Sequence, residues 1–407
     1  MLAQTMAGKW RKLLEEESEH QWLAMGMFFL FVLFGAFALG ATEHFVGDKV
    51  VANDTWHSGK VVIDIQYHDA NESYTALVYS VQSGYALGTE YLEDGTGAVV
   101  YSEDGTDKGA DVRFLKTMPN GEILFSVANN QLIGLKNHLM VAYEYPLDNG
   151  EFGILDVAEH EADGGTQRLL LTQEGTETSL RGVVGMMPTT AMSTSSGVQW
   201  HAVEAYEPGL WMALGSHIST AGADGSSPAT PEHRPALGWI AWDGTSSTPV
   251  LRNVQMFSEG VLHSVASADN AMIVGGTKES LIVHSDNDVE VLKVGCAQVV
   301  EDSYGTVWFM PKQGALTVST YDDAGLSTHV LSRPVPINVN VADAQGDFVH
   351  SHGTDVEGNP IQWDIDVTAN GSIESGRGFL NLLYLLAGGI LLAMMLWHAG
   401  EQLLGEG

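Results

Sequence analysis

Residues 270–292, NAMIVGGTKESLIVHSDNDVEVL, contain the pattern that decides the fold. An apolar run follows Asn270, then come a polar turn, a second apolar run, and an Asp-rich hairpin that leads into a third run. Short runs rich in β-branched residues, separated by turn residues, predict antiparallel strands. Residues 305–325, GTVWFMPKQGALTVSTYDDAG, have the same order of elements. The pattern is therefore a repeated unit, and not a single hairpin.

The same unit recurs through residues 42–377, where amphipathic helical periodicity is almost absent. The strand that opens each copy is expected to start near residues 74, 122, 168, 210, 271, 306 and 347. These starts are about 45 residues apart on average, the length of a four-stranded propeller blade. The longest interval contains residues 218–235, which we interpret as a loop insertion. We therefore predict an all-β, seven-bladed β-propeller, with six or eight blades as variants and a pair of β-sandwiches as the alternative.

Two copies of the unit carry a family resemblance. Residues 209–213, GLWMA, and 305–309, GTVWF, resemble the inner-strand signature of WD40-like and PQQ-type propellers. The Gly-His and Trp-Asp pairs of true WD40 repeats are missing, apart from Trp242-Asp243. The resemblance implies the propeller fold and no particular activity.

Two uncharged apolar segments bracket the repeats, and we expect both to be transmembrane helices, at residues 22–41 and 378–398. Three cations precede the first segment, so the positive-inside rule places both chain ends in the cytoplasm. Residues 42–377 then form an extracytoplasmic domain that the two helices anchor in the cell membrane, so the lipid bilayer is an expected partner. Residues 1–21 form a cytoplasmic segment that either lies flat on the inner leaflet or extends the helix. Residues 399–407 form a short cytoplasmic tail.

Charge separates the exterior region from the rest of the chain. The chain has 51 Asp+Glu and 18 Lys+Arg, for a net charge of −33, and residues 42–377 account for about −30 of it. This balance excludes a nucleic-acid partner, which would require a basic surface. It is typical of a domain exposed to high salt, and it suggests an archaeal source. Three glycosylation sequons, at Asn53, Asn71 and Asn370, also fall on the predicted exterior.

Two groups of side chains are candidate metal ligands. His350 and His352 are two apart on a predicted strand, so both imidazoles lie on one face, with Asp355 in the next turn. The acids that follow Tyr101 have the oxygen density of a calcium loop but not its spacing, and two successive hairpin turns are the alternative reading. The acids of this second group are Asp104, Asp107 and Asp111.

Other chemistry has weak support in the sequence. No nucleophile elbow, Walker A, dinucleotide or zinc-protease motif occurs, so no catalytic residue is predicted. No cofactor is predicted beyond a divalent ion, either calcium or a transition metal. Cys296 is interpreted as a small core residue. Most tryptophans are expected in the core between blades.

These observations predict a membrane-tethered extracytoplasmic propeller that binds a partner, as an accessory or assembly subunit of an envelope complex. The partner is expected to be another envelope or membrane protein. A propeller enzyme, acting on a glycan or with a quinone cofactor, is the first alternative. A metal-dependent adhesion module is the second.

Overall fold

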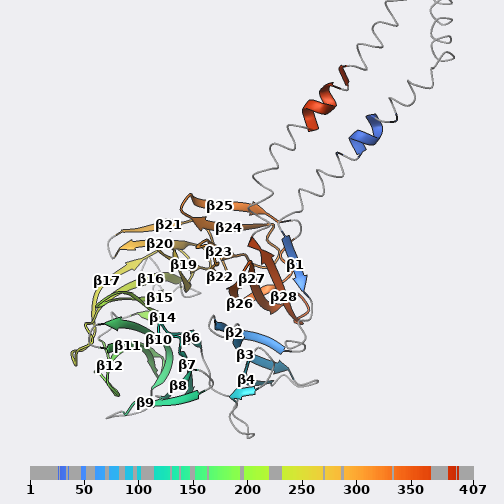
Figure 1. Cartoon of the computed structure of the whole chain (residues 1–407). Coiled ribbons are helices and arrows are strands. Elements are labelled where there is room, and N and C mark those ends of the chain that lie inside the picture. The colour runs from blue at the N-terminus through green and yellow to red at the C-terminus, as the bar shows by residue number, and fades with distance from the viewer. Residues whose placement is uncertain are drawn as a thin grey trace, which may run out of the picture. The chain divides into compact units, whose positions relative to one another are not determined.

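A computed structural model provides the coordinates, and Figure 1 shows the whole chain. The structure describes residues 26, 28–33, 35, 47–51, 60–68, 73–81, 88–94, 99–101, 114–128, 131–136, 139–146, 152–162, 165–192, 197–219, 232–268, 271–285, 288–331, 334–367, 384–390, 392 and 393.

Within these residues the chain forms seven four-stranded sheets. Six of them are built from four strands that are consecutive in sequence. The first three of these six are β2 (Lys60–His68), β3 (Ser73–Val81), β4 (Gly88–Asp94) and β5 (Val99–Tyr101); β6 (Leu115–Thr117), β7 (Ile123–Ala128), β8 (Gln131–Lys136) and β9 (Leu139–Glu144); and β10 (Gly153–Ala162), β11 (Gly165–Glu174), β12 (Glu177–Val184) and β13 (Met187–Pro188).

The other three are β14 (Val198–Glu207), β15 (Leu210–Ser219), β16 (Glu232–Ala241) and β17 (Val250–Met256); β18 (Leu262–Ala268), β19 (Ala271–Gly276), β20 (Ser280–Ser285) and β21 (Asp288–Leu292); and β22 (Gln298–Glu301), β23 (Val307–Met310), β24 (Thr317–Asp322) and β25 (Gly325–Val330). The seventh sheet joins the two ends of the repeat region. Its order is β1-β28-β27-β26, from β1 (Gly47–Val51), β26 (Asn338–Gln345), β27 (Phe348–Thr354) and β28 (Pro360–Asp366).

The sheets follow one another around a closed ring. Each sheet packs against the next along the chain, through its first strand in all sheets except β6–β9, where β7 meets β10. β2 contacts β26, which returns the ring to its start. Figure 1 shows the sheets arranged radially in this order. The prediction of an all-β propeller is therefore confirmed, and the β-sandwich alternative is wrong. The strand expected to open each repeat unit is the second strand of its sheet, and these strands begin at residues 73, 123, 165, 210, 271, 307 and 348.

Tryptophans fill the core between sheets, as predicted. Apolar side chains alternate inward along half-buried strands, and a large ring buries the most area at each position. Trp200, Trp211, Trp239 and Trp363 are completely buried. Cys296 is also buried, which agrees with its interpretation as a core residue.

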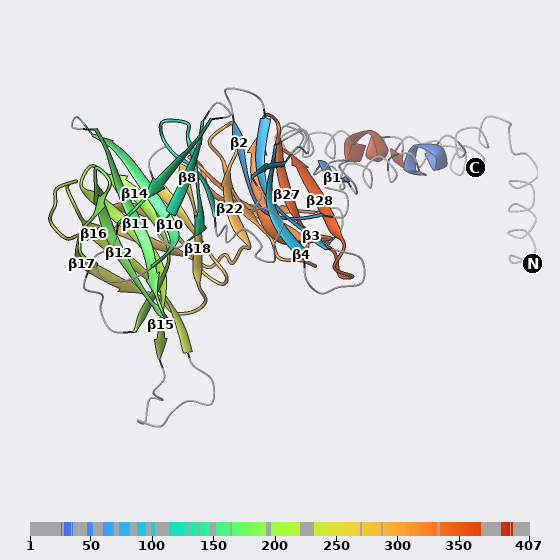
Figure 2. The ribbon, with the colours of Figure 1, turned by 90° about the horizontal axis from the view of Figure 1, so that it is seen from below.

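The expected loop at residues 218–235 is partly wrong. Strands β15 and β16 continue into it, with Ile218 opposite His233 and Ser219 opposite Glu232. Figure 2 shows the β15–β16 hairpin reaching past the neighbouring strands. Two strands that pair in register can continue beyond the core, because the backbone N–H and C=O groups of each added pair form hydrogen bonds between the strands.

The predicted membrane spans fall mostly outside the described residues. Short helical stretches are described at residues 28–33 and 384–390, and they contact each other. The ring of Phe31 stacks on that of Tyr384 with centroids 5.0 Å apart, and the Tyr384 hydroxyl donates to the carbonyl of Val32. In the part of the chain that the structure describes, no helix is both long enough and apolar enough to cross a bilayer.

Candidate functional site

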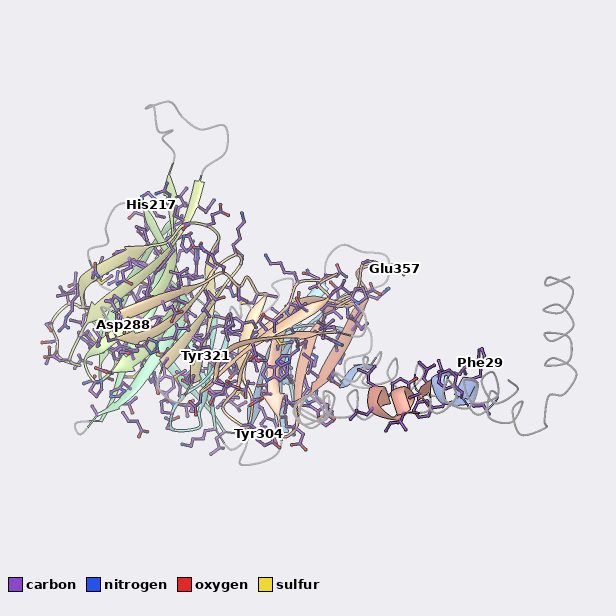
Figure 3. The ribbon with its side chains drawn as sticks, turned by 90° about the horizontal axis from the view of Figure 1, so that it is seen from above. Phe29, His217, Asp288, Tyr304, Tyr321 and Glu357 are labelled. Carbon is purple, nitrogen blue, oxygen red and sulfur yellow. The ribbon has the colours of Figure 1, made fainter. Side chains whose placement is uncertain are left out.

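The connections between strands divide the ring into two faces. The turns that join first to second strands lie on one face. The connections from second to third strands, and from each sheet to the next, lie on the other, which we name the loop face. Figure 3 shows this division, with His217 and Glu357 on one side of the ring and Tyr304 on the other. His217, His233 and the turn after His352 all lie at second-to-third connections, so they share the loop face.

An open groove crosses the loop face between the sheet β18–β21 and the sheet β22–β25. Its volume is about 890 Å³, against about 470 Å³ for a cavity on the opposite face. Four connections line it, at residues 257–261, 277–279, 293–297 and 311–316, together with the strands β24 and β25. Lys278, Lys293 and Lys312 are among the lining residues, and we name this cavity the cationic groove.

The β19–β20 turn holds the walls of the groove together. The Thr277 hydroxyl accepts the N–H of Val261 at 3.0 Å, and the Thr277 carbonyl accepts the ammonium of Lys312. The Glu279 carboxylate accepts the N–H of Ser258 at 3.2 Å. A Cβ on Gly295 would lie 2.6 Å from the Thr277 carbonyl, so only glycine permits this close approach. The β19–β20 turn therefore holds in place the three other connections that line the groove, at residues 257–261, 293–297 and 311–316.

The three lysines differ in how their charge is balanced. Lys278 lies 2.7 Å from Glu259, and both side chains are exposed. The hydrogen bond that Lys278 donates to this carboxylate raises the pKa of Lys278. Lys293 pairs with the buried Glu279, and its hydrogen bond lowers the pKa of that carboxyl. Among the described residues, Lys312 pairs with no carboxylate, and its ammonium donates to the Thr277 carbonyl.

A smaller cavity of about 330 Å³ adjoins the cationic groove and extends it toward the sheet β14–β17. It shares Ser258, Glu259 and Lys278 with the groove and adds His233 and Arg234 from β16. The cationic side chains thus span the loop edges of three consecutive sheets.

A second charged cluster lies on the first strands of the ring. Lys116 on β6 reaches Glu204 on β14 at 2.7 Å and Asp156 on β10 at 3.4 Å, and it donates to the Val203 carbonyl at 2.7 Å. Its two carboxylates raise the pKa of Lys116 against the opposing effect of burial. Burial raises the pKa of Glu204. These contacts connect three consecutive sheets of the ring.

Asp64 on β2 makes the same kind of connection. Its two carboxylate oxygens accept the N–H of Ile65 at 2.8 Å and of Leu115 at 2.7 Å, so it ties β2 to β6. Asp156 does likewise between β10 and β14, accepting the N–H of Val157 and of Val203, both at 2.8 Å. Burial raises the pKa of Asp64 to about 7, and the nearby charge of Asp156 adds to the shift. We interpret this cluster as structural, because its charged groups pair with one another or with backbone groups of the neighbouring strands.

The histidines predicted as metal ligands lie on β27. His350 is hydrogen-bonded through Nδ1 to Asp364 Oδ1 at 2.7 Å, and His352 is 4% exposed. Asp355 accepts the N–H groups of Glu357 and Asn359 within its own turn, at 2.8 and 2.9 Å, so its carboxylate shapes a β-turn. Hydrogen bonds from Asn359 lower the pKa of Asp355.

Across the described ranges, no three His, Cys, Asp or Glu side chains converge closely enough to hold a metal ion. Metal binding at β27 stays a prediction. The acids of the second candidate site, Asp104, Asp107 and Asp111, lie outside the described residues, as do the sequon asparagines Asn53, Asn71 and Asn370.

Reasoning from the sequence did not identify the cationic groove. A signal was present, since Lys278 and Lys312 each occupy the turn after the second strand of consecutive repeats, and Lys293 follows the fourth strand of the first of them. Those connections share one face of a propeller. In a chain with few cations, three lysines at such positions indicate a local site.

Comparisons with known proteins assign no family to the chain. No protein-family model matches the chain, and no curated protein matches it. Several solved structures are similar at low identity. The β-propeller domain of Cps50 (Swd1) from Myceliophteria thermophila is 10% identical, with a TM-score of 0.48, over 78% of this chain and 99% of that one. The Dos1 propeller is 10% identical, with a TM-score of 0.48, over 78% and 94%. A puromycin-hydrolyzing peptidase of Mycobacterium tuberculosis is 13% identical, with a TM-score of 0.44, over 81% of this chain and 52% of that one.

Proposed function

We propose that this chain is a seven-bladed, membrane-tethered propeller that serves as a binding or scaffold subunit of an envelope complex. Its partner docks on the loop face, across the cationic groove. The observation that carries this proposal is the groove itself, an open cavity of about 890 Å³ whose walls are held in place by the Thr277–Glu279 turn. Loops braced on a rigid ring are a common way to present a recognition surface.

The two helical stretches support the membrane tether. Large apolar side chains on them are exposed, including Phe29 at 67%, Leu33 at 69%, Leu385 at 69% and Ile390 at 59%. Patches of this kind mark surfaces that meet lipid or another protein. The uncharged segments at residues 22–41 and 378–398 have the length that a bilayer requires.

The test is affinity purification of the full chain from its own membranes in a mild detergent. A tethered chain stays with the membrane pellet after carbonate washing, and release into the wash contradicts the tether. The intact chain is expected to retain an envelope protein. A lone, monodisperse chain at native abundance contradicts the scaffold role.

Two bulky substitutions, one at each end of β24, test which face of the ring binds the partner. Thr317 begins β24 at the cationic groove, and Ala324 follows β24 at the opposite face. Thr317→Trp fills the groove and is expected to lose the partner, whereas Ala324→Trp is expected to keep it. Retention by both variants, or loss only from Ala324→Trp, contradicts docking on the loop face.

A further inference from the structure

Cationic side chains gather on the loop face although the chain as a whole is strongly acidic. Arg234, Lys278, Lys293 and Lys312 line two adjoining cavities that share Lys278. These are four of only 18 Lys+Arg in a chain of net charge −33. Two carboxylates line the same cavities, and they pair with two of these cations, Glu259 with Lys278 and Glu279 with Lys293.

Part of this positive charge is available to an incoming anion. Lys312 has no carboxylate partner among the described residues, and its ammonium carries three donors, of which one goes to the Thr277 carbonyl. The pair of Lys278 and Glu259 is exposed, at 62% and 64% for the two side chains. Exposed pairs of this kind are weak because water competes for both ions. A ligand carboxylate can therefore replace Glu259 at little cost.

The remaining lining of the groove favours a polypeptide over a simple anion. Val294, Pro311 and Ala315 provide an apolar lining next to the lysines. Hydroxyls of Thr317, Ser319 and Thr328 line the groove along β24 and β25. Apolar atoms beside point charges suit a segment that alternates carboxylates with apolar side chains. A sulfated sugar or a free phosphate would leave the apolar part unused.

The acidity of the rest of the molecule contributes specificity. An acidic segment is repelled wherever the surface carries the net negative charge of the chain, and it is attracted at the cationic groove. Repulsion away from a site is as effective in directing a ligand as attraction at it. Charge complementarity of this kind also determines where the two molecules first meet.

We propose that the cationic groove binds an acidic polypeptide segment of the partner, with carboxylates at Lys312 and Lys278 and an apolar side chain at Val294 and Pro311. This inference rests on the proposed function, because it names the chemistry of the segment that docks on the loop face.

A labelled peptide tests the inference directly. Fluorescence anisotropy would measure binding of a fluorescein-tagged peptide, EELEELEE, to the full chain in detergent at 0.15 M salt, where the Debye length is about 8 Å. The amide version, QQLQQLQQ, is expected to bind at least about tenfold more weakly, because hydrogen bonds to charged groups contribute most. Equal binding of the two peptides overturns the inference.

A matched pair of lysine variants locates the site. Lys136 lies in the sheet β6–β9, outside the groove, and its ammonium donates to the carbonyl of Asn120 in the β6–β7 turn, just as that of Lys312 donates to a carbonyl in the groove. Lys312→Gln is expected to weaken peptide binding by on the order of tenfold, whereas Lys136→Gln changes it less than about twofold. Thr317→Trp, which blocks the groove without changing charge, is expected to abolish binding. Equal effects of the two lysine variants overturn the inference, as does tighter binding of dextran sulfate than of the peptide.

The two proposals fail in different ways. If Thr317→Trp loses the partner but the acidic peptide does not bind, docking on the loop face stands and the acidic segment is wrong. If the peptide binds at Lys312 but no envelope protein purifies with the chain, the groove binds acidic segments and the scaffold role is wrong.

Discussion

At the scale of single residues, carboxylates on the first strands connect one sheet to the next. Asp64 and Asp156 each follow a register shift in a first strand, between Val62 and Asp64 and between Ile154 and Asp156. A β-bulge re-aims the side chain that follows it. Each carboxylate then accepts the N–H of a residue in another first strand, Leu115 for Asp64 and Val203 for Asp156. In the sequence these acids resemble ordinary polar positions of a half-buried strand, so this role could not be predicted.

The raised pKa of Asp64 predicts a pH dependence of stability. The pKa is about 7 in the fold against 3.8 for the free group, so the folded chain binds the proton more tightly. The resulting stabilisation is complete below about pH 4 and is lost as the pH rises to about 7. Asp64→Asn removes this dependence. The melting temperature of the original chain minus that of the variant should therefore fall between pH 4.5 and 8.

Asp355→Asn is the control for that titration. The pKa of Asp355 is lowered by its hydrogen bonds, so this carboxyl is ionised across the whole range. The difference in melting temperature between the original chain and Asp355→Asn should stay constant from pH 4.5 to 8. A constant difference for Asp64→Asn as well would show that the two carboxyls titrate alike.

At the scale of elements, the repeat pattern predicted the strands well and the connections less well. The second strands begin within three residues of their expected positions, because β-branched runs and turn residues are local signals. The hairpin β15–β16 extends beyond its expected end, because strand pairing depends on a partner that is distant in sequence. The cationic groove was missed for the same reason, since its lysines come together only when two sheets pack.

Glycines inside strands make room for the largest core rings. The ring of Trp200 on β14 lies across the two next strands of its own sheet. A Cβ on Gly238 of β16 would lie 2.5 Å from this ring, and one on Gly215 of β15 would lie 2.8 Å from it. From the sequence alone, a glycine within a strand indicates either a β-bulge or a close approach of another group to the backbone. At Gly215 and Gly238 the structure shows a close approach of the Trp200 ring.

Gly238→Ala is expected to destabilise the propeller through this contact. Forcing a methyl group against a packed ring costs about 1–3 kcal/mol, which a urea unfolding curve would measure as a lower midpoint. In Trp200→Phe the smaller ring leaves space at this position. The double variant should therefore lose less stability than the sum of the two single variants. Additive losses would show that the methyl group and the ring do not meet.

At the scale of the whole molecule, the ring closes through strands from its two ends. β1 completes the sheet that β26, β27 and β28 begin, and this places it at the outer edge of that sheet. Without β1, the outer edge of β28 would present unpaired backbone groups, which lower stability and promote association. Propeller closure therefore depends on five residues that lie far from the rest of their sheet in sequence.

Two truncations measure the contribution of β1. Both lack the first helical stretch, but one begins at residue 47 and keeps β1, and the other begins at residue 52 and loses it. The shorter chain is expected to melt at a lower temperature and to elute as larger species in gel filtration. Equal melting temperatures and elution volumes would mean that β1 does not close the ring.

The same closure determines how the ring responds to mechanical load. The first strand and the last strand are hydrogen-bonded neighbours in one sheet, so tension applied between the two ends of the ring acts first on the β1–β28 ladder. The other six sheets carry no load until that ladder has separated. Under traction the ring should therefore yield at one joint, while the sheets that form the cationic groove keep their shape.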